Sequence, residues 1–152
     1  SLTNTGGYDY NSPDTYRSEL GGVGGITNAQ SLAEMMTPLA QNNEKIISKE
    51  GVKRLSQSNI RSDIDSMLLL PTNFSEGFML NMDNRGKFEG EGGSFLIGNN
   101  AFGHVGFGGS SATFADPDCK LAFGYIVNKL GGEYLINERA QSLIDETYKS
   151  LI

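Results

Sequence analysis

The chain has 152 residues, of which 38% are apolar and 20% are charged, and its formal net charge is −6 at pH 7. This length and composition are typical of a single globular segment. The acidic balance and the scattered positions of Lys and Arg argue against nucleic-acid binding, because phosphate contacts need clustered cations.

The two ends of the chain carry few targeting features. No apolar run reaches the ~20 residues that a helix needs to cross a bilayer, and the first residues lack the cationic start and apolar centre of a signal peptide. The sequence therefore predicts no membrane span and favours a soluble cytoplasmic or organellar protein over a secreted one, while the compartment stays unknown. The chain begins without Met, which suggests a processed or truncated product.

The first half of the chain predicts helices after an irregular start. Thr27 and Gln30 form a capping box, in which each side chain satisfies a backbone donor at a helix start. An apolar stripe at helical spacing follows it: Leu32, Met35, Met36, Leu39 and Ala40. Ser48 is expected to cap a second, shorter helix that ends near residue 57. The residues from 58 to 73 predict a loop.

The second half predicts strands and turns, followed by one more helix. We expect strands over 74–82, 101–106, 110–117 and 120–129, with a tight antiparallel reversal at Asp116-Pro117-Asp118 between the last two. The glycine-rich residues from 86 to 100 predict a loop that holds at most one short strand. Asn137 is expected to cap the final helix, whose apolar stripe is Ala140, Leu143, Ile144, Thr147, Tyr148 and Leu151.

These elements give the order helix, helix, three to four antiparallel strands, helix, in one segment that covers residues 1–152. Within it, 1–25 is irregular, 26–73 helical, 74–130 antiparallel strands and 137–151 a C-terminal helix. An antiparallel sheet flanked by helices is the α+β class.

The only histidine, His104, lies among glycines, and several chemistries are open to it. A phosphate-binding loop is disfavoured, because a strand and not a helix follows Gly106-Phe107-Gly108-Gly109. No G-x-S-x-G nucleophile motif occurs. A Ser-His-Asp triad that pairs His104 with Asp116 stays possible. With one cysteine, Cys119, and one histidine, the chain predicts no disulfide, metal site or cofactor.

Two quoted stretches carry a resemblance to a known family. "FGHVGFGGSSATFADPDCKLAFGYIVNKL" (102–130) and "NERAQSLIDETYKSL" (137–151) resemble the C-terminal part of class C β-lactamase-related serine hydrolases. This family includes esterases and animal β-lactamase-like proteins and shares the penicillin-binding-protein transpeptidase fold. The family's active-site strand carries Lys-Thr-Gly or His-x-Gly, and His104-Val105-Gly106 matches the second form.

The resemblance implies roles for three residues of that strand. His104 would face the substrate and donate to it or hold the proton network of the site. Gly106 would leave room for the substrate to approach the strand. The backbone N–H of Phe107 would be one donor of the oxyanion hole, which stabilises the tetrahedral intermediate.

The family's nucleophile motifs are missing from the chain. No Ser precedes a Lys by three positions, and no Tyr or Ser precedes an Asn by two, so Ser-x-x-Lys and Tyr-x-Asn are both absent. We therefore expect the C-terminal fragment of a hydrolase whose parent acts on ester, amide or peptide bonds through an acyl-serine intermediate. The fragment alone would be inactive, and its partners would be the substrate and the missing N-terminal part of the same domain.

A second hypothesis is a non-catalytic scaffold or self-associating module with the same fold. The strand at 120–129 would expose an unpaired edge in the absence of the N-terminal strands. On this ground the fragment is expected to form a homo-oligomer.

Overall fold

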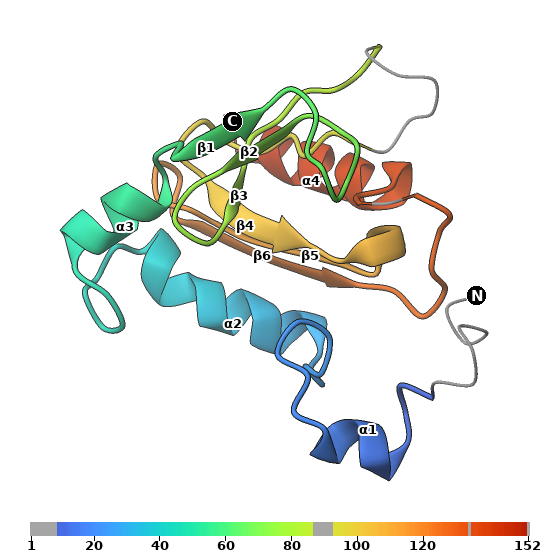
Figure 1. Ribbon diagram of the computed structural model, residues 1–152. Coiled ribbons are helices and arrows are strands. Elements are labelled where there is room, and N and C mark those ends of the chain that lie inside the picture. The colour runs from blue at the N-terminus through green and yellow to red at the C-terminus, as the bar shows by residue number, and fades with distance from the viewer. Residues whose placement is uncertain (1–8, 87–92, 134, 152) are drawn as a thin grey trace.

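The computed structural model describes residues 9–86, 93–133 and 135–151 (Figure 1). The described helices are α1 (Pro13–Arg17), α2 (Ala29–Ala40), α3 (Lys49–Leu55) and α4 (Glu138–Lys149). The described strands are β1 (Ile60–Ser62), β2 (Thr72–Phe74), β3 (Met79–Leu80), β4 (Phe102–Val105), β5 (Ser111–Asp116) and β6 (Leu121–Ile126). A short 3-10 helix spans Phe107–Gly109.

The strands form one antiparallel sheet in the order β1-β2-β3-β4-β5-β6. Its best-paired part is the ladder of β5 with β6, which runs from the pair Ser111–Ile126 to the pair Asp116–Leu121. The expected reversal between these two strands is therefore confirmed. The α+β class, with an antiparallel sheet and flanking helices, is confirmed as well.

The sheet has six strands, where three to four were expected. The segment 74–82 was expected as one strand, but Gly77 (φ +121°) bends it into a hairpin between β2 and β3. β1 lies in the segment expected to be a loop and pairs with β2 through Ile60–Phe74. Both differences arise because pairing with a neighbouring strand decides the conformation of short segments that have weak patterns of their own.

Side-chain caps define where the helices begin. Ser48 and Asn137 cap α3 and α4 as expected. The start of α2 differs by one residue, since the Asn28 side chain, not that of Thr27, accepts the hydrogen bond from the Ser31 N–H at 2.9 Å. The Ser12 side chain caps α1, with Pro13 at its first position, inside the segment expected to be irregular.

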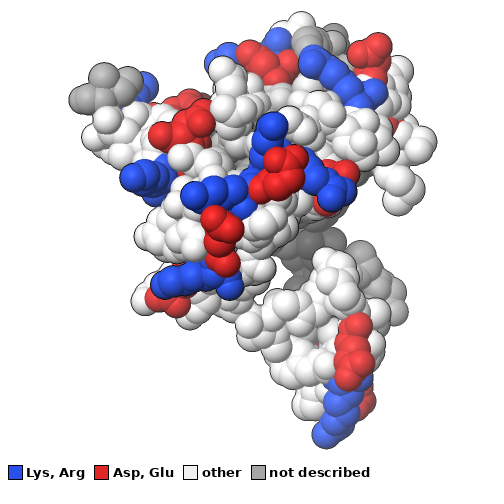
Figure 2. Space-filling view, turned by 90° about the vertical axis from the view of Figure 1, so that its left-hand side faces the viewer, with Lys and Arg blue, Asp and Glu red and all other residues white. Residues whose placement is uncertain are grey.

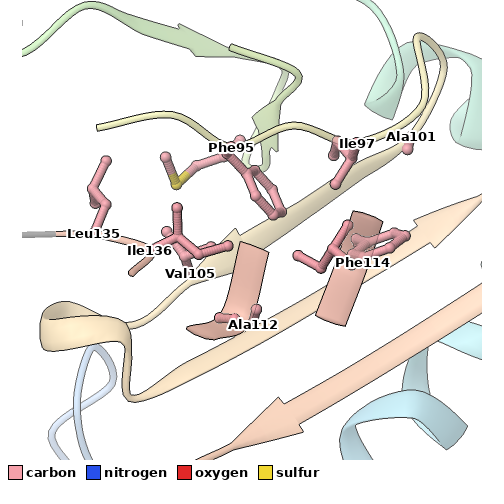
Figure 3. Close-up of a cluster of buried hydrophobic side chains, with 11 residues drawn as sticks. Phe95, Ile97, Ala101, Val105, Ala112, Phe114, Leu135 and Ile136 are labelled. Atoms are coloured by element: carbon pink, nitrogen blue, oxygen red, sulfur yellow. The ribbon is translucent and has the colours of Figure 1, made fainter. Parts of the chain in front are cut away.

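Helices cover both faces of the sheet (Figure 1). On one face, α2 and α3 pack over the sheet in a cluster made of Met36, Leu39, Ala40, Val52, Leu80, Phe102 and Ala115. On the other face, α4 packs over the larger cluster shown in Figure 3, which includes Phe95, Val105, Ala112, Phe114, Ile136, Ala140 and Ile144. Of the apolar stripe predicted for α4, Leu143 and Leu151 stay about half exposed, so the stripe that contacts the sheet is narrower than expected.

The C-terminal end of α4 is joined to the sheet by two partly buried hydrogen bonds of Tyr148. The Tyr148 hydroxyl donates to the Asp116 carboxylate at 2.8 Å and accepts from the Gly98 N–H at 2.9 Å. Asp116 is only 2% exposed. A side chain at Gly98 would collide with the Asp116 carboxylate. Burial, and then the neighbouring Asp116, raise the pKa of Tyr148 above its usual value.

The hydrogen bonds of Tyr148 predict the effect of Tyr148→Phe. The change leaves the buried Asp116 oxygen without its donor, so the free energy of unfolding should fall by about 1–3 kcal/mol in urea denaturation at neutral pH. The phenol of the unfolded chain loses its proton near pH 10.0, while the folded chain keeps it to higher pH. The stabilisation of the fold by the Tyr148 hydroxyl is therefore fully present below pH 10.0 and declines as the pH rises further. The Phe variant should lack this alkaline loss.

Tyr16→Phe is the matched control, because Tyr16 is 47% exposed on α1. It should leave the free energy of unfolding within about 0.5 kcal/mol of the unmodified chain. Equal effects of the two substitutions would contradict the role given to the Tyr148–Asp116 bond.

Candidate functional site

His104 lies exposed at the end of β4, between buried neighbours. Phe102 belongs to the cluster under α2, whereas Val105 belongs to the cluster under α4. Because side chains alternate along a strand, His104 lies on the α2 face of the sheet. Its pairing partner Thr113 confirms this, since the Thr113 hydroxyl lies 3.5 Å from the Leu32 carbonyl oxygen of α2.

One hydrogen bond fixes the tautomer of the His104 ring. Nδ1 lies 2.8 Å from the carbonyl oxygen of Val105. A carbonyl oxygen only accepts, so Nδ1 must carry a proton in this bond. In the neutral imidazole, Nε2 is then the acceptor. The ring therefore offers one proton-accepting nitrogen at neutral charge.

A glycine turn follows His104 and connects β4 to β5. The Gly106 N–H donates to the Ser111 carbonyl oxygen at 2.8 Å. Phe107 begins the 3-10 helix and is 50% exposed. Gly108 and Gly109 both have positive φ, +66° and +62°. Such a pair of left-handed residues is favourable only for glycine, so the sequence of the turn is dictated by its backbone.

Gly106 lies close to two serine hydroxyls. Its φ of −86° is open to any residue. A side chain there would collide with the Ser110 hydroxyl and would lie 2.6 Å from the Ser111 hydroxyl. The resemblance explained Gly106 by the approach of a substrate. Within the chain itself, the two serine hydroxyls already occupy the space that a side chain would need.

The structure brings His104, Gly106 and Phe107 together at one strand end but keeps Asp116 away from them. Asp116 lies at the opposite end of β5, three residues beyond the partner of His104, and its carboxylate binds Tyr148. The alternative His104–Asp116 triad is therefore wrong. Sequence spacing had left it open because strand register is not visible in the sequence.

Sequence reasoning found no sign that the segment 131–137 contacts the glycine turn. The Gly109 N–H donates to the Leu135 carbonyl oxygen, and the Gly131 N–H donates to the Gly108 carbonyl oxygen, each at 2.8 Å. The side chain of Asn137 lies beside the same glycines. The only local signal was the capping position of Asn137, which gave no indication of a contact with residues 108–109.

Other reactive groups offer little in the described part of the chain. No group of three or more His, Cys, Asp or Glu side chains is placed there to hold a metal ion. Desolvation, and then Asp116, raise the pKa of the Cys119 thiol, which disfavours the reactive thiolate. None of the described helices is long and apolar enough to span a membrane. On the face in Figure 2, cationic and anionic side chains are interspersed.

Comparison with known proteins finds one matching family model and several solved structures with a similar fold. The family model described as beta-lactamase matches residues 2–145. Among solved structures, a penicillin-binding-protein homologue from Caulobacter crescentus is 29% identical with a TM-score of 0.63, and a family VIII carboxylesterase is 27% identical with a TM-score of 0.59. EstA from Arthrobacter nitroguajacolicus Rue61a, at 21% identity and a TM-score of 0.58, shares the fold.

The matches to the three structures cover 79%, 78% and 81% of this chain but only 31%, 30% and 31% of the matched chains. The chain thus spans about a third of their length. No curated protein matches it. The sheet with helices on both faces is of the β-lactamase and transpeptidase type. The chain belongs to the β-lactamase family, and the solved structures that it matches include a penicillin-binding-protein homologue and a family VIII carboxylesterase.

The glycine turn predicts the effect of Gly109→Ala. A left-handed conformation costs an L-residue about 1–2 kcal/mol, and the new methyl group would also collide with the Asn137 amide. The free energy of unfolding should therefore fall by at least about 1 kcal/mol in urea denaturation. Gly132→Ala is the control, because a methyl group at that position would meet no atom within 4 Å. An unchanged midpoint for Gly109→Ala would contradict this account of the turn.

Proposed function

We propose that this chain supplies the substrate-side strand of a β-lactamase-related serine hydrolase that acts on ester, amide or peptide bonds. The observation that carries the proposal is the position of His104, exposed near the end of β4 and two residues before the glycines of the turn, in a chain of this family. In an antiparallel sheet an exposed strand end beside a rigid turn is a suitable surface on which to lay a substrate.

Each of the three residues has a role in this proposal. The resemblance gave His104 a donor role or a role in the proton network. With Nδ1 bound to Val105, the role proposed here is the second one, in which Nε2 accepts a proton or a hydrogen bond from the reacting groups. The backbone N–H of Phe107 serves, by the family resemblance, as one donor of the oxyanion hole for the tetrahedral intermediate. Gly106 leaves room for the substrate beside the strand, and a side chain there would displace the Ser110 hydroxyl.

The nucleophile comes, in this proposal, from the missing N-terminal part of the same domain. The chain contains no Ser-x-x-Lys and no Tyr-x-Asn, and it spans about a third of the structures that it matches. The acyl-serine would form on that part, and the chain alone would be inactive. The carboxylesterase match supports ester chemistry for the parent, as does the His-x-Gly form of the strand.

The outer edge of β6 supports a second element of the proposal. β6 is the last strand of the sheet, and no described residue pairs with its outer edge. The Val127 N–H donates to the Ser110 carbonyl oxygen, so the alternation of an antiparallel ladder directs the N–H groups of Ala122, Gly124 and Ile126 outward. We propose that strands of the missing N-terminal part pair here. Without them the chain self-associates, as the scaffold alternative also requires.

Acylation tests the catalytic part of the proposal. A fluorophosphonate probe should label the longer protein that carries the upstream residues and should leave this 152-residue chain unlabelled. His104→Ala in the longer protein should slow labelling by about 10²-fold, the usual contribution of one general acid–base group. Labelling of the short chain, or an unchanged rate for His104→Ala, would remove the corresponding part of the assignment.

Light scattering after size-exclusion chromatography tests the β6 edge. The chain should elute as a concentration-dependent oligomer, and Ile126→Lys should shift it towards the monomer, because a charge on an exposed edge opposes strand pairing. Ile60→Lys is the matched control, since Ile60 is exposed on β1 at the other edge of the sheet. A monodisperse monomer at all concentrations, or equal effects of both substitutions, would refute pairing through β6.

A further inference from the structure

The turn after the His-x-Gly motif is held by a segment more than twenty residues further along the chain. Backbone hydrogen bonds connect Gly109 to Leu135 and Gly131 to Gly108, each at 2.8 Å. These two bonds hold the N–H of Gly109 and the carbonyl oxygen of Gly108, which belong to the same peptide group of the turn. The conformation of the turn therefore depends on where the later segment lies.

A single carboxamide, that of Asn137, fills the space among these glycines. Asn137 is 3% exposed, and its Nδ2 lies 3.5 Å from the Gly108 carbonyl oxygen. A side chain at Gly109 would collide with Nδ2, and one at Gly131 would lie 3.3 Å from it. The absence of side chains at these glycines is what admits the amide.

The other end of the same carboxamide caps α4. The Asn137 Oδ1 accepts from the Ala140 N–H at 3.1 Å. Asp and Ser cap helices about as well as Asn, so capping alone needs only an acceptor. The amide nitrogen is the additional group, and it faces the glycine turn. α4 itself is fixed to the sheet by the fully buried side chains of Ala140 and Ile144.

From this geometry we propose that Asn137 is a positioning residue for the oxyanion site. Its amide ties the Gly108–Gly109 turn to the rigid start of α4, and thereby sets the place of the adjacent Phe107 N–H relative to His104 on β4. This role rests on the proposed function given above. Donors of an oxyanion hole act through fixed positions, and a displacement of about 1 Å can cost about 10²-fold in rate.

Asn137→Asp separates the two ends of the carboxamide. The variant keeps the capping acceptor but replaces the donor with an oxygen that faces the Gly108 carbonyl. It also adds a carboxylate beside Gly131. The Glu133 Oε2 atom is already buried next to Gly131, with no hydrogen-bond partner among the described residues, so the variant places a second carboxylate near it. Amide hydrogen exchange of this chain, followed by mass spectrometry, should be up to about tenfold faster in peptides that cover 106–112. Exchange within α4 should be unchanged.

Asn28→Asp is the matched control. Asn28 caps α2 in the same way, through a 2.9 Å hydrogen bond from the Ser31 N–H, and the atoms nearest to where side chains at Gly106, Gly108 and Gly109 would lie belong to other residues. Its exchange pattern at 106–112 should equal that of the unmodified chain. Asn137→Ser, which keeps a capping oxygen and adds no charge, serves if the Asp variant does not fold and should show the same faster exchange at the turn.

The longer protein gives the catalytic readout. There Asn137→Asp should lower kcat for an ester substrate by about tenfold with KM little changed, because only a transition-state interaction is displaced. Unchanged exchange at 106–112 in both Asn137 variants would overturn the proposal, and so would faster exchange with unchanged kcat. If the unmodified longer protein shows no acylation, the proposed function fails, while the exchange result still decides whether Asn137 holds the turn.

Discussion

The burial of Phe114 is the constraint on which the rest of the structure depends. Its ring is fully buried and stacks on Phe123 of β6 at 5.1 Å and on Tyr148 of α4 at 5.9 Å, and it meets the edge of Phe95 at 6.3 Å. Aromatic pairs of this kind add about 0.5–1.5 kcal/mol each beyond the area that they bury. The opposite residue on β4 is Gly103, whose missing side chain leaves room for Phe114. One ring thus joins two strands, a helix and the segment before β4.

The orientation of Phe114 also decides which face of the sheet carries the candidate site. Since Phe114 faces α4, its neighbour Thr113 faces α2, and His104 lies opposite Thr113 on that same face. α2 can lie close to this face because Gly124 has no side chain to collide with the Ala29 carbonyl oxygen. The face on which His104 lies is therefore set by the same strand register that places Phe114 in the core.

Much of the local structure was predictable from residues a few positions apart, but the arrangement of the site was only partly so. Ser48 and Asn137 were recognisable as caps, because a cap bonds to a backbone N–H three residues later. The His-x-Gly strand was recognisable by resemblance. The hairpin at Gly77 and the pairing of β1 were not, because these short segments take their conformation from strand neighbours. The nearness of the Ser110 hydroxyl to Gly106 also emerged only in three dimensions.

The sequence by itself determined the α+β class and the antiparallel reversal at residues 116–118, because both depend on side-chain type and short-range spacing. Only the tertiary structure decided that the Asp116 carboxylate accepts a hydrogen bond from Tyr148 and does not pair with His104, and that Asn137 contacts the turn at Gly109. Those contacts join residues about thirty positions apart. They are set by strand register and by the packing of α4 on the sheet, which no local pattern encodes.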